Sequence, residues 1–223
     1  MPVRTWTIVP AAGAGARFRA STPKQYADLA GRPVLLHTLE RLAMLDAAAI
    51  FVALAPDDVR FDRLIGARPG VHPLRCGDDD WILVHDAARP CVPRESLRRL
   101  VLALADDAVG GLLALPLADT LKRAAAAGDP PRVMRTEERD GLWLAQTPQM
   151  FRHRLLAAAH GLDVAARCTD EAQAIEALAA TGVCEMPKLV RGSAANVKIT
   201  YPDDLALAAA ILQMQATHVN GET

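Results

Sequence analysis

The sequence predicts an α/β protein with a doubly wound, mostly parallel sheet. Apolar segments of strand length alternate with amphipathic segments of helix length along the 223 residues. The apolar segments are continuous rather than alternating, which is typical of parallel strands that helices cover on both faces. A loop of Gly and Ala directly follows the first apolar segment, and in such folds ligands bind beyond the carboxyl ends of the strands. We therefore expect a single domain, 1–223, with its site at that edge.

Each predicted element has a local signal. The strands are runs of apolar and often β-branched residues at 5–9, 50–54, 81–85, 111–116 and 196–200. Pro33 and Pro93 suit the first position of a helix, and leucines recur behind both at helical spacing. Asp170 and Glu171 favour the first turn of another helix, where acidic side chains are stabilising. The last helix begins at 202–204.

The stretch 118–141 interrupts this alternation. It holds four consecutive alanines, then Gly128-Asp129-Pro130-Pro131, then a polar run. Irregular segments of this length inside a compact domain are usually functional or disordered. We expect a hairpin-like arm that leaves the sheet, with a surface loop as the alternative.

Composition narrows the classes of function. The net charge is −1 with no basic run, so a nucleic-acid or membrane partner gains no support. No apolar run approaches the roughly 20 residues of a membrane span. The first residues lack a signal-peptide pattern and the four cysteines lack a C-x-x-C pair, so a cytoplasmic location is expected. The six histidines lack metal-ligand spacing, and we expect no metal bound by the protein alone.

The Gly-rich loop after the first strand is typical of an anion site. It reads Pro10-Ala11-Ala12-Gly13-Ala14-Gly15-Ala16-Arg17, and Pro23-Lys24-Gln25 follows. Small residues let backbone N–H groups approach a phosphate, and the cations Arg17 and Lys24 would neutralise its charge. The spacing matches neither a P-loop nor a dinucleotide fingerprint. A plain tight turn would explain the glycines alone, but not the two cations.

Asp86 ends the strand 81–85 and is a candidate ligand contact. Its carboxylate would bind a ribose hydroxyl or face a phosphate-bound Mg²⁺, and the two alanines after it leave room for a flat ligand. The alternative is that Asp86 caps a turn and pairs with Arg89. We expect His85 to be a satisfied buried side chain, and Lys198 to be either a site residue or an exposed edge lysine.

The motifs, taken in order, resemble those of the 2-C-methyl-D-erythritol 4-phosphate cytidylyltransferase family over nearly the whole chain. They are Pro10-Ala11-Ala12-Gly13-x-Gly15-x-Arg17, Pro23-Lys24-Gln25-Tyr26, His85-Asp86-Ala87-Ala88-Arg89-Pro90, Pro116-x-x-Asp119-Thr120-x-Lys122, Arg139-x-Gly141-Leu142-Trp143, Thr147-Pro148-Gln149, Thr169-Asp170-Glu171-Ala172 and Asn196-x-Lys198-Ile199-Thr200. The resemblance implies a Rossmann-like nucleotidyltransferase fold. It also implies a reaction of isoprenoid precursor biosynthesis, in which CTP and 2-C-methyl-D-erythritol 4-phosphate give 4-diphosphocytidyl-2-C-methyl-D-erythritol and pyrophosphate.

The resemblance further implies roles for individual residues. The catalytic set would be Arg17 and Lys24, which stabilise developing charge, and Arg139 and Lys198, which hold the substrate phosphate. The nucleotide would be bound by Pro10, Ala11, Ala12, Gly13, Gly15, Asp86 and Ala87. The substrate would be bound by Arg89, Thr120, Thr147 and Thr169, with the threonines as hydrogen-bond donors. Mg²⁺ would be bound mainly through the CTP phosphates, and the 118–141 arm would form a homodimer in which it completes the neighbour's site.

Two other functions are open. Ribitol-5-phosphate cytidylyltransferases share the fold, but they look like Leu-Ala-Gly-Gly, His-Asp-Ser-Val-Arg and Thr-Asp-Ala where this chain has Pro10-Ala11-Ala12-Gly13, Ala87-Ala88 and Glu171. The first family also has a loop with an Arg and a Ser-Val-x-Asn-Gly segment before the strand 81–85, which is missing here between Gly77 and Asp78. Either the loop is deleted, or the protein has residues there that this sequence lacks, which we favour. A deletion would remove nucleotide contacts and favour a catalytically silent nucleotide-binding protein.

Overall fold

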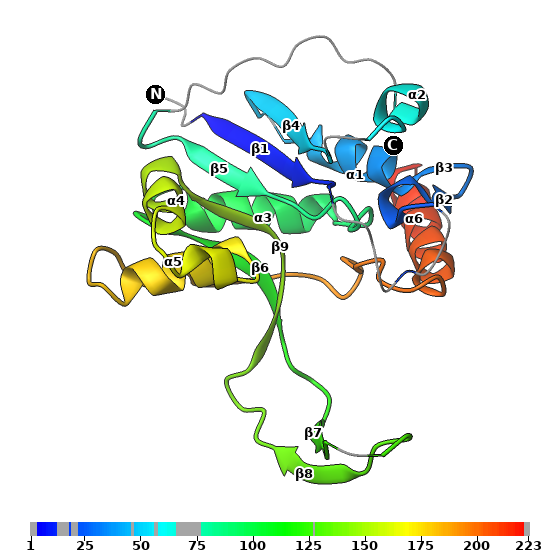
Figure 1. Cartoon of the computed structure of the whole chain (residues 1–223). Coiled ribbons are helices and arrows are strands. Elements are labelled where there is room, and N and C mark those ends of the chain that lie inside the picture. Colours follow the sequence, from blue (N-terminus) through cyan, green and yellow to red (C-terminus); the bar gives the residue numbers. More distant parts are fainter. Residues whose placement is uncertain are drawn as a thin grey trace.

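The computed structural model describes residues 4–12, 18, 22–45, 47–55, 58–65, 77–126 and 128–220. Among these residues a six-stranded sheet has the order β10-β6-β9-β5-β1-β4. Its strands are β1 (Thr5–Pro10), β4 (Ala49–Ala53), β5 (Trp81–Val84), β6 (Gly110–Pro116), β9 (Trp143–Arg152) and β10 (Lys188–Arg191). All neighbours pair in parallel except β9, which is antiparallel to β5 and β6. The mostly parallel sheet is confirmed, with one unpredicted antiparallel strand inside it (Figure 1).

Helices cover both faces of this sheet, as the continuous apolar strands predict. They are α1 (Val34–Leu42), α2 (Phe61–Ile65), α3 (Arg94–Leu104), α4 (His153–His160), α5 (Glu171–Ala179) and α6 (Asp204–Asn220), with the short elements η1 (Lys24–Tyr26), β2 (Asp28–Leu29), β3 (Arg32–Pro33) and η2 (Ala165–Arg167). Leu83 of β5 faces the core that α1 and α3 cover, whereas Ile82 faces the core that α4 and α5 cover. The strand period of two thus supplies both cores from one strand.

The helix starts follow the predicted signals closely. Pro33 and Pro93 are the residues directly before α1 and α3. Asp170 caps α5, because its carboxylate accepts a hydrogen bond from the backbone N–H of Gln173 at 2.9 Å. The predicted strand at 196–200 is wrong, because this segment joins no sheet. It lies against the loop after β5, where the N–H of Ile199 donates to the carbonyl of Ala88 at 2.9 Å.

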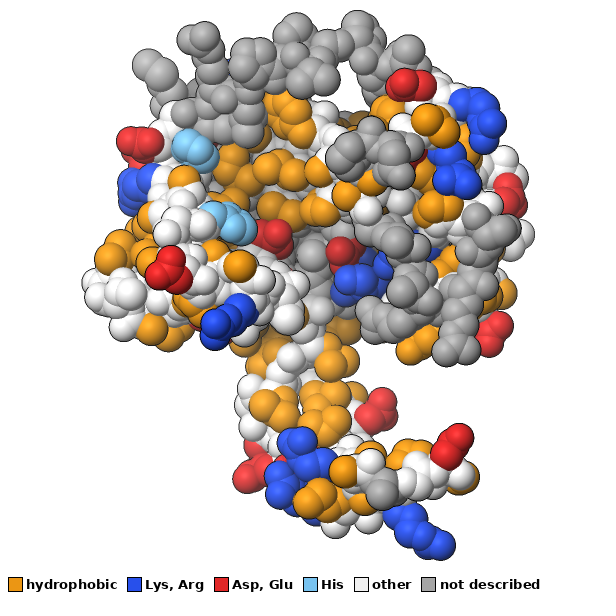
Figure 2. All heavy atoms as spheres, viewed as in Figure 1, with side chains coloured by type: hydrophobic (Ala, Val, Ile, Leu, Met, Phe, Trp, Pro, Cys, Tyr) orange, Lys and Arg blue, Asp and Glu red, His pale blue; other side chains and the backbone are white. Residues whose placement is uncertain are grey.

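The stretch 118–141 forms an arm built on an antiparallel hairpin of β7 (Leu121–Ala124) and β8 (Val133–Glu137). It extends away from the sheet beyond the ends of β6 and β9 (Figure 1), and the surface-loop alternative is wrong. Apolar side chains lie on the outside of the arm and its stem (Figure 2). Leu121, Val133, Met134, Leu142, Trp143 and Leu144 are between 37 and 63% exposed. The arm therefore carries apolar surface that this chain leaves in water.

A tight turn connects directly into β5 where the sequence is shorter than expected. The N–H of Asp80 donates to the carbonyl of Gly77 at 3.1 Å, and the indole of Trp6 donates to the Asp80 carboxylate at 2.9 Å. Gly77 and Asp80 are thus continuous and tied to β1. No helix of the described residues has the length and apolarity that crossing a membrane requires.

Candidate active site

The candidate site lies at the carboxyl ends of β1 and β5, as the fold predicts. The N–H of Ala11 donates to the carbonyl of Ala53 at 2.8 Å, which aligns the end of β1 with β4. The buried Gln25 amide donates to the carbonyl of Ala11 at 2.7 Å. Because Lys24 precedes Gln25 in η1, this bond places Lys24 near Pro10, Ala11 and Ala12. The other predicted residues of this loop, Gly13, Gly15 and Arg17, lie outside the described residues.

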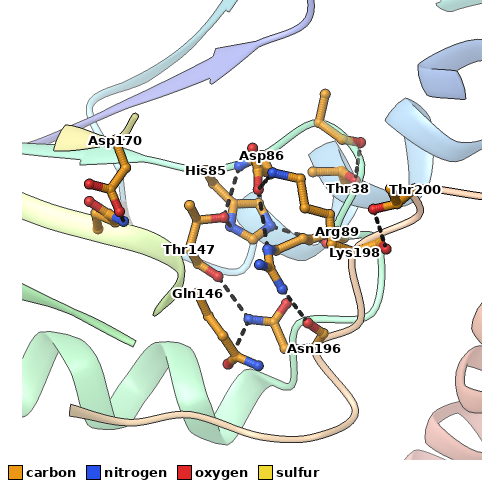
Figure 3. A network of polar contacts seen from close by, with 12 residues as sticks. Thr38, His85, Asp86, Arg89, Gln146, Thr147, Asp170, Asn196, Lys198 and Thr200 are labelled. Atoms are coloured by element: carbon orange, nitrogen blue, oxygen red, sulfur yellow. Dashed lines mark hydrogen bonds and ion pairs between the residues drawn. The ribbon is translucent and has the colours of Figure 1, made fainter. Parts of the chain in front are cut away.

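Asp86 is the charged centre of the site (Figure 3). Its Oδ2 contacts the Lys198 Nζ at 2.9 Å and the Arg89 Nε at 3.2 Å. No donor from the described residues contacts Oδ1, although the side chain is 28% exposed. Burial raises the pKa of Asp86, but Lys198 and then Arg89 outweigh burial and hold the pKa below its ordinary value. Asp86 is therefore an ionised carboxylate with one oxygen available to a ligand.

Arg89 supports Asp86 from below. Its side chain is buried, and besides Asp86 it donates to the carbonyl of Asn196 at 2.7 Å. The pairing of Asp86 with Arg89, one of the two alternatives for this motif, is present. The substrate contact of Arg89 stays a prediction, since in this chain its guanidinium binds groups of the protein. Ala87 lies in the same turn, where its carbonyl accepts from the buried hydroxyl of Thr38 at 2.9 Å.

Asn196 holds the Lys198 segment against the sheet. The fully buried Asn196 amide donates to the carbonyl of Thr147 at 2.8 Å and to Gln146 Oε1 at 3.3 Å, both on β9. Gln146 in turn donates to the carbonyl of Ser193 at 3.0 Å. Lys198 is therefore positioned by side-chain bonds rather than by a strand. Asn196 and Gln146 were not predicted as site residues, and their only signal is that amides stand in otherwise apolar surroundings.

The start of α5 is attached to the same wall of the site. Gln149 of β9 donates to the Asp170 carboxylate at 3.0 Å and accepts from the N–H of Ala172 at 2.7 Å. Thr169, a predicted substrate contact, lies exposed beside this cap and donates to the Gln173 side chain at 3.1 Å. Burial, with the charges of Asp170 and Asp86, raises the pKa of Glu171. The edge near α5 is consequently acidic, whereas the edge near Lys24 and Lys198 is cationic.

The arm holds the remaining predicted residues away from this centre. Thr120 and Arg139 flank the β7–β8 hairpin, and the Arg139 guanidinium donates to the carbonyl of Ala118 within the arm. The arm projects from the far side of the stem (Figure 1). One chain therefore brings Lys24 and Lys198 to the same edge of the sheet but leaves Thr120 and Arg139 apart from them. Among the described residues no three His, Cys, Asp or Glu side chains are grouped closely enough for a metal site.

Comparison with known sequences identifies relatives over almost the whole chain. The profile of the family 2-C-methyl-D-erythritol 4-phosphate cytidylyltransferase matches residues 5–72 and 68–214. The chain is 50% identical over 233 aligned residues to the enzyme of that name from Dechloromonas aromatica (strain RCB), covering 94% of this chain and 98% of the relative. It is 49% identical over 229 residues to the enzyme of that name from Laribacter hongkongensis (strain HLHK9), with 94 and 96% covered.

Solved structures give the same relation. The crystal structure of a 4-diphosphocytidyl-2C-methyl-D-erythritol synthase superposes with a TM-score of 0.77 at 33% identity, covering 95% of this chain and all of the other. The cytidylyltransferase of Thermus thermophilus superposes with a TM-score of 0.68 at 31% identity, covering 96% of this chain and all of that one. The Rossmann-like nucleotidyltransferase fold is thereby confirmed.

The alignments also locate where this chain is short. The two aligned lengths of 233 and 229 residues exceed the 223 residues of the chain, so the relatives have residues without a counterpart here. The two ranges that match the family profile meet at 68–72. The missing residues therefore fall between α2 and β5, before the Gly77–Asp80 turn.

We expect Arg89→Ala to destabilise the protein by about 2–4 kcal/mol, because it leaves Asp86 and the carbonyl of Asn196 without a buried partner. Arg139→Ala removes an exposed guanidinium and should change the free energy of unfolding by less than about 0.5 kcal/mol. Urea denaturation of both variants measures the difference. Equal stabilities would show that the Arg89 contacts contribute nothing to the fold.

Proposed function

The chain belongs to the 2-C-methyl-D-erythritol 4-phosphate cytidylyltransferase family, and from this premise we propose how it joins CTP to 2-C-methyl-D-erythritol 4-phosphate. The products are 4-diphosphocytidyl-2-C-methyl-D-erythritol and pyrophosphate, in isoprenoid precursor biosynthesis. The single observation that carries the assignment is the match along nearly the whole chain, with half of the aligned residues identical to those of a relative so named.

The reaction is an in-line attack by an oxygen of the substrate phosphate on the α-phosphorus of CTP. A phosphate monoester is already nucleophilic near neutral pH, so the enzyme must position the two substrates and neutralise charge. The site suits this task, since its described ionisable groups are Lys24, Lys198 and Asp86 with their buried supports. Mg²⁺ would be held mainly by the CTP phosphates and would neutralise them further.

The nucleotide would lie across the carboxyl ends of β1 and β5. Backbone of Pro10, Ala11 and Ala12, continuing through Gly13 and Gly15, would contact the base and phosphates. Asp86 Oδ1 would accept a hydrogen bond from the ribose, with the small side chain of Ala87 beside it. The open Oδ1 supports this role, because Oδ2 already binds Lys198 and Arg89.

The cations would divide the two phosphates between them. Lys24, with Arg17, would stabilise charge that develops on the α-phosphate and the leaving pyrophosphate. Lys198 would hold the substrate phosphate, because an ammonium has three donors and only one points at Asp86. Thr169 at the start of α5 would donate to the same substrate from the other side.

We further propose that the protein is a homodimer in which each arm completes the partner's site. The exposed apolar side chains of the arm and stem support this, because surfaces of this kind usually mark an interface. Arg139 and Thr120 would then reach the substrate phosphate of the partner. A cytoplasmic location is likewise proposed, and the cysteines described, Cys91, Cys168 and Cys184, are free thiols.

A second candidate, a silent nucleotide-binding protein, is favoured by one observation. The chain lacks residues between α2 and β5 that its relatives have, and the resemblance assigns nucleotide contacts to the loop there. The two functions differ in turnover but not in CTP binding.

With CTP, Mg²⁺ and 2-C-methyl-D-erythritol 4-phosphate, we expect the protein to release pyrophosphate and form the cytidine diphosphate product. Ribitol 5-phosphate should be a much poorer acceptor, because the chain follows the methylerythritol pattern at each diagnostic motif. A coupled pyrophosphate assay measures both. Equal turnover of the two acceptors would overturn the specificity, and CTP binding without turnover of either would establish the silent protein.

We expect Lys24→Met to lower kcat by roughly 10² or more, while the affinity for CTP falls less, because Lys24 acts on charge that appears in the transition state. Steady-state kinetics at saturating CTP and a direct CTP titration separate the two effects. If kcat at saturation is preserved and only CTP affinity is lost, Lys24 is a ground-state binding residue.

The composite site predicts complementation between inactive subunits. Arg139→Ala and Lys198→Ala homodimers should each be nearly inactive. In a mixed dimer one site carries both defects and the other carries neither, so activity should approach half the wild-type value per dimer. Subunit exchange is followed with differently tagged chains. If exchange occurs and the mixture stays inactive, the arm serves its own chain.

A further inference from the structure

His85 is a buried titratable residue to which the proposed mechanism gives no role. It follows β5 directly, precedes Asp86 and is completely buried. Both ring nitrogens have partners: Nδ1 lies 3.1 Å from the hydroxyl of Thr147, and Nε2 lies 3.1 Å from the carbonyl of Arg89. The same Thr147 hydroxyl lies 3.0 Å from the backbone nitrogen of Asp86 (Figure 3).

These contacts allow one arrangement of protons. The carbonyl of Arg89 only accepts, so His85 must carry a proton on Nε2. Burial lowers the pKa of His85 to about 4, so the ring is neutral and Nδ1 has no proton. Nδ1 therefore accepts the hydroxyl proton of Thr147, and the Thr147 oxygen accepts the N–H of Asp86. Thr147 has no proton left for a substrate.

The imidazole consequently holds both ends of the turn that presents Asp86. At the first end it acts through Thr147 on the N–H of Asp86, and at the second end it binds the carbonyl of Arg89 directly. The N–H of Arg89 donates to the carbonyl of Asp86 at 3.1 Å and closes the turn. Thr147 is on β9, so the turn is also fixed relative to the neighbouring strand.

We propose that His85 is a positioning residue that, through the Thr147 hydroxyl, orients the Asp86 carboxylate toward the ribose of CTP. The inference rests on the proposed function, in which Asp86 accepts a hydrogen bond from the ribose. It changes the predicted role of Thr147 from a donor to substrate into a link between His85 and Asp86.

The test is the preference for CTP over 2′,3′-dideoxy-CTP, measured as the ratio of their dissociation constants by calorimetry. A hydrogen bond to a charged group predicts a preference on the order of tenfold or more in the wild type. His85→Gln places its amide near the Nε2 position and leaves Thr147 without an acceptor, so the ratio should fall toward one. His85→Asn places its amide near Nδ1 and should keep most of the preference.

A purely structural role for His85 would weaken both nucleotides equally in both variants and would leave the ratio unchanged, which overturns the proposal. Thr147→Ser keeps the hydroxyl and Thr147→Val removes it, so the same contrast is available if His85 variants do not fold. In the double variant His85→Gln/Thr147→Val the ratio should be no lower than in the worse single variant, since both changes break one link. Independent losses would contradict the link.

Nitrogen-15 NMR gives a readout that needs neither turnover nor nucleotide. At neutral pH we expect His85 to show a protonated Nε2 and an unprotonated Nδ1, and a proton on Nδ1 overturns the inference. These measurements are separate from the pyrophosphate assay. An active enzyme that binds CTP and 2′,3′-dideoxy-CTP equally would refute the role of His85 and leave the proposed reaction standing. A preference that depends on His85 in a protein without turnover would do the reverse.

Discussion

A carboxylate partly withdrawn from water needs compensating charge and hydrogen bonds, and Asp86 imposes this requirement on the whole site. Its partners come from two separate segments, since Arg89 follows in the same turn whereas Lys198 is more than a hundred residues away. The distant segment has to be held in place, and Asn196 does this by binding two groups of β9. Packing of Ile199 with Ala88 and Cys91 completes the attachment.

β9 has two roles that meet at one point of its length. Its first residues are the exposed stem of the arm, and its later residues are buried between β5 and β6. The change falls at Gln146 and Thr147, the residues that contact Asn196, His85 and Asp86. The arm and the site are therefore parts of one continuous strand, which supports an arrangement in which contacts made by the arm act close to the chemistry.

The central strands, their helices and the anion-binding edge could be predicted from the sequence, because each has a local pattern of apolar residues, prolines or an acidic cap. β9 could not, since Pro148 argues against an inner strand. The structure accommodates Pro148 where the register with β6 shifts between Leu112 and Ala114, so no regular ladder bond is needed there. The segment around Lys198 has β-branched neighbours that predict a strand, but its position depends on the side chain of Asn196, which no propensity describes.

The double use of β9 also determines where this protein tolerates changes in chain length. Side chains of a strand alternate between faces, so one residue inserted between Trp143 and Gln149 would turn Gln146, Thr147 and Gln149 to the wrong faces at once. The tip of the arm between β7 and β8 has no such alternation to preserve, because its residues are exposed on both sides. Over evolutionary time, insertions and deletions should accumulate at the tip, while the length of the stem stays constant.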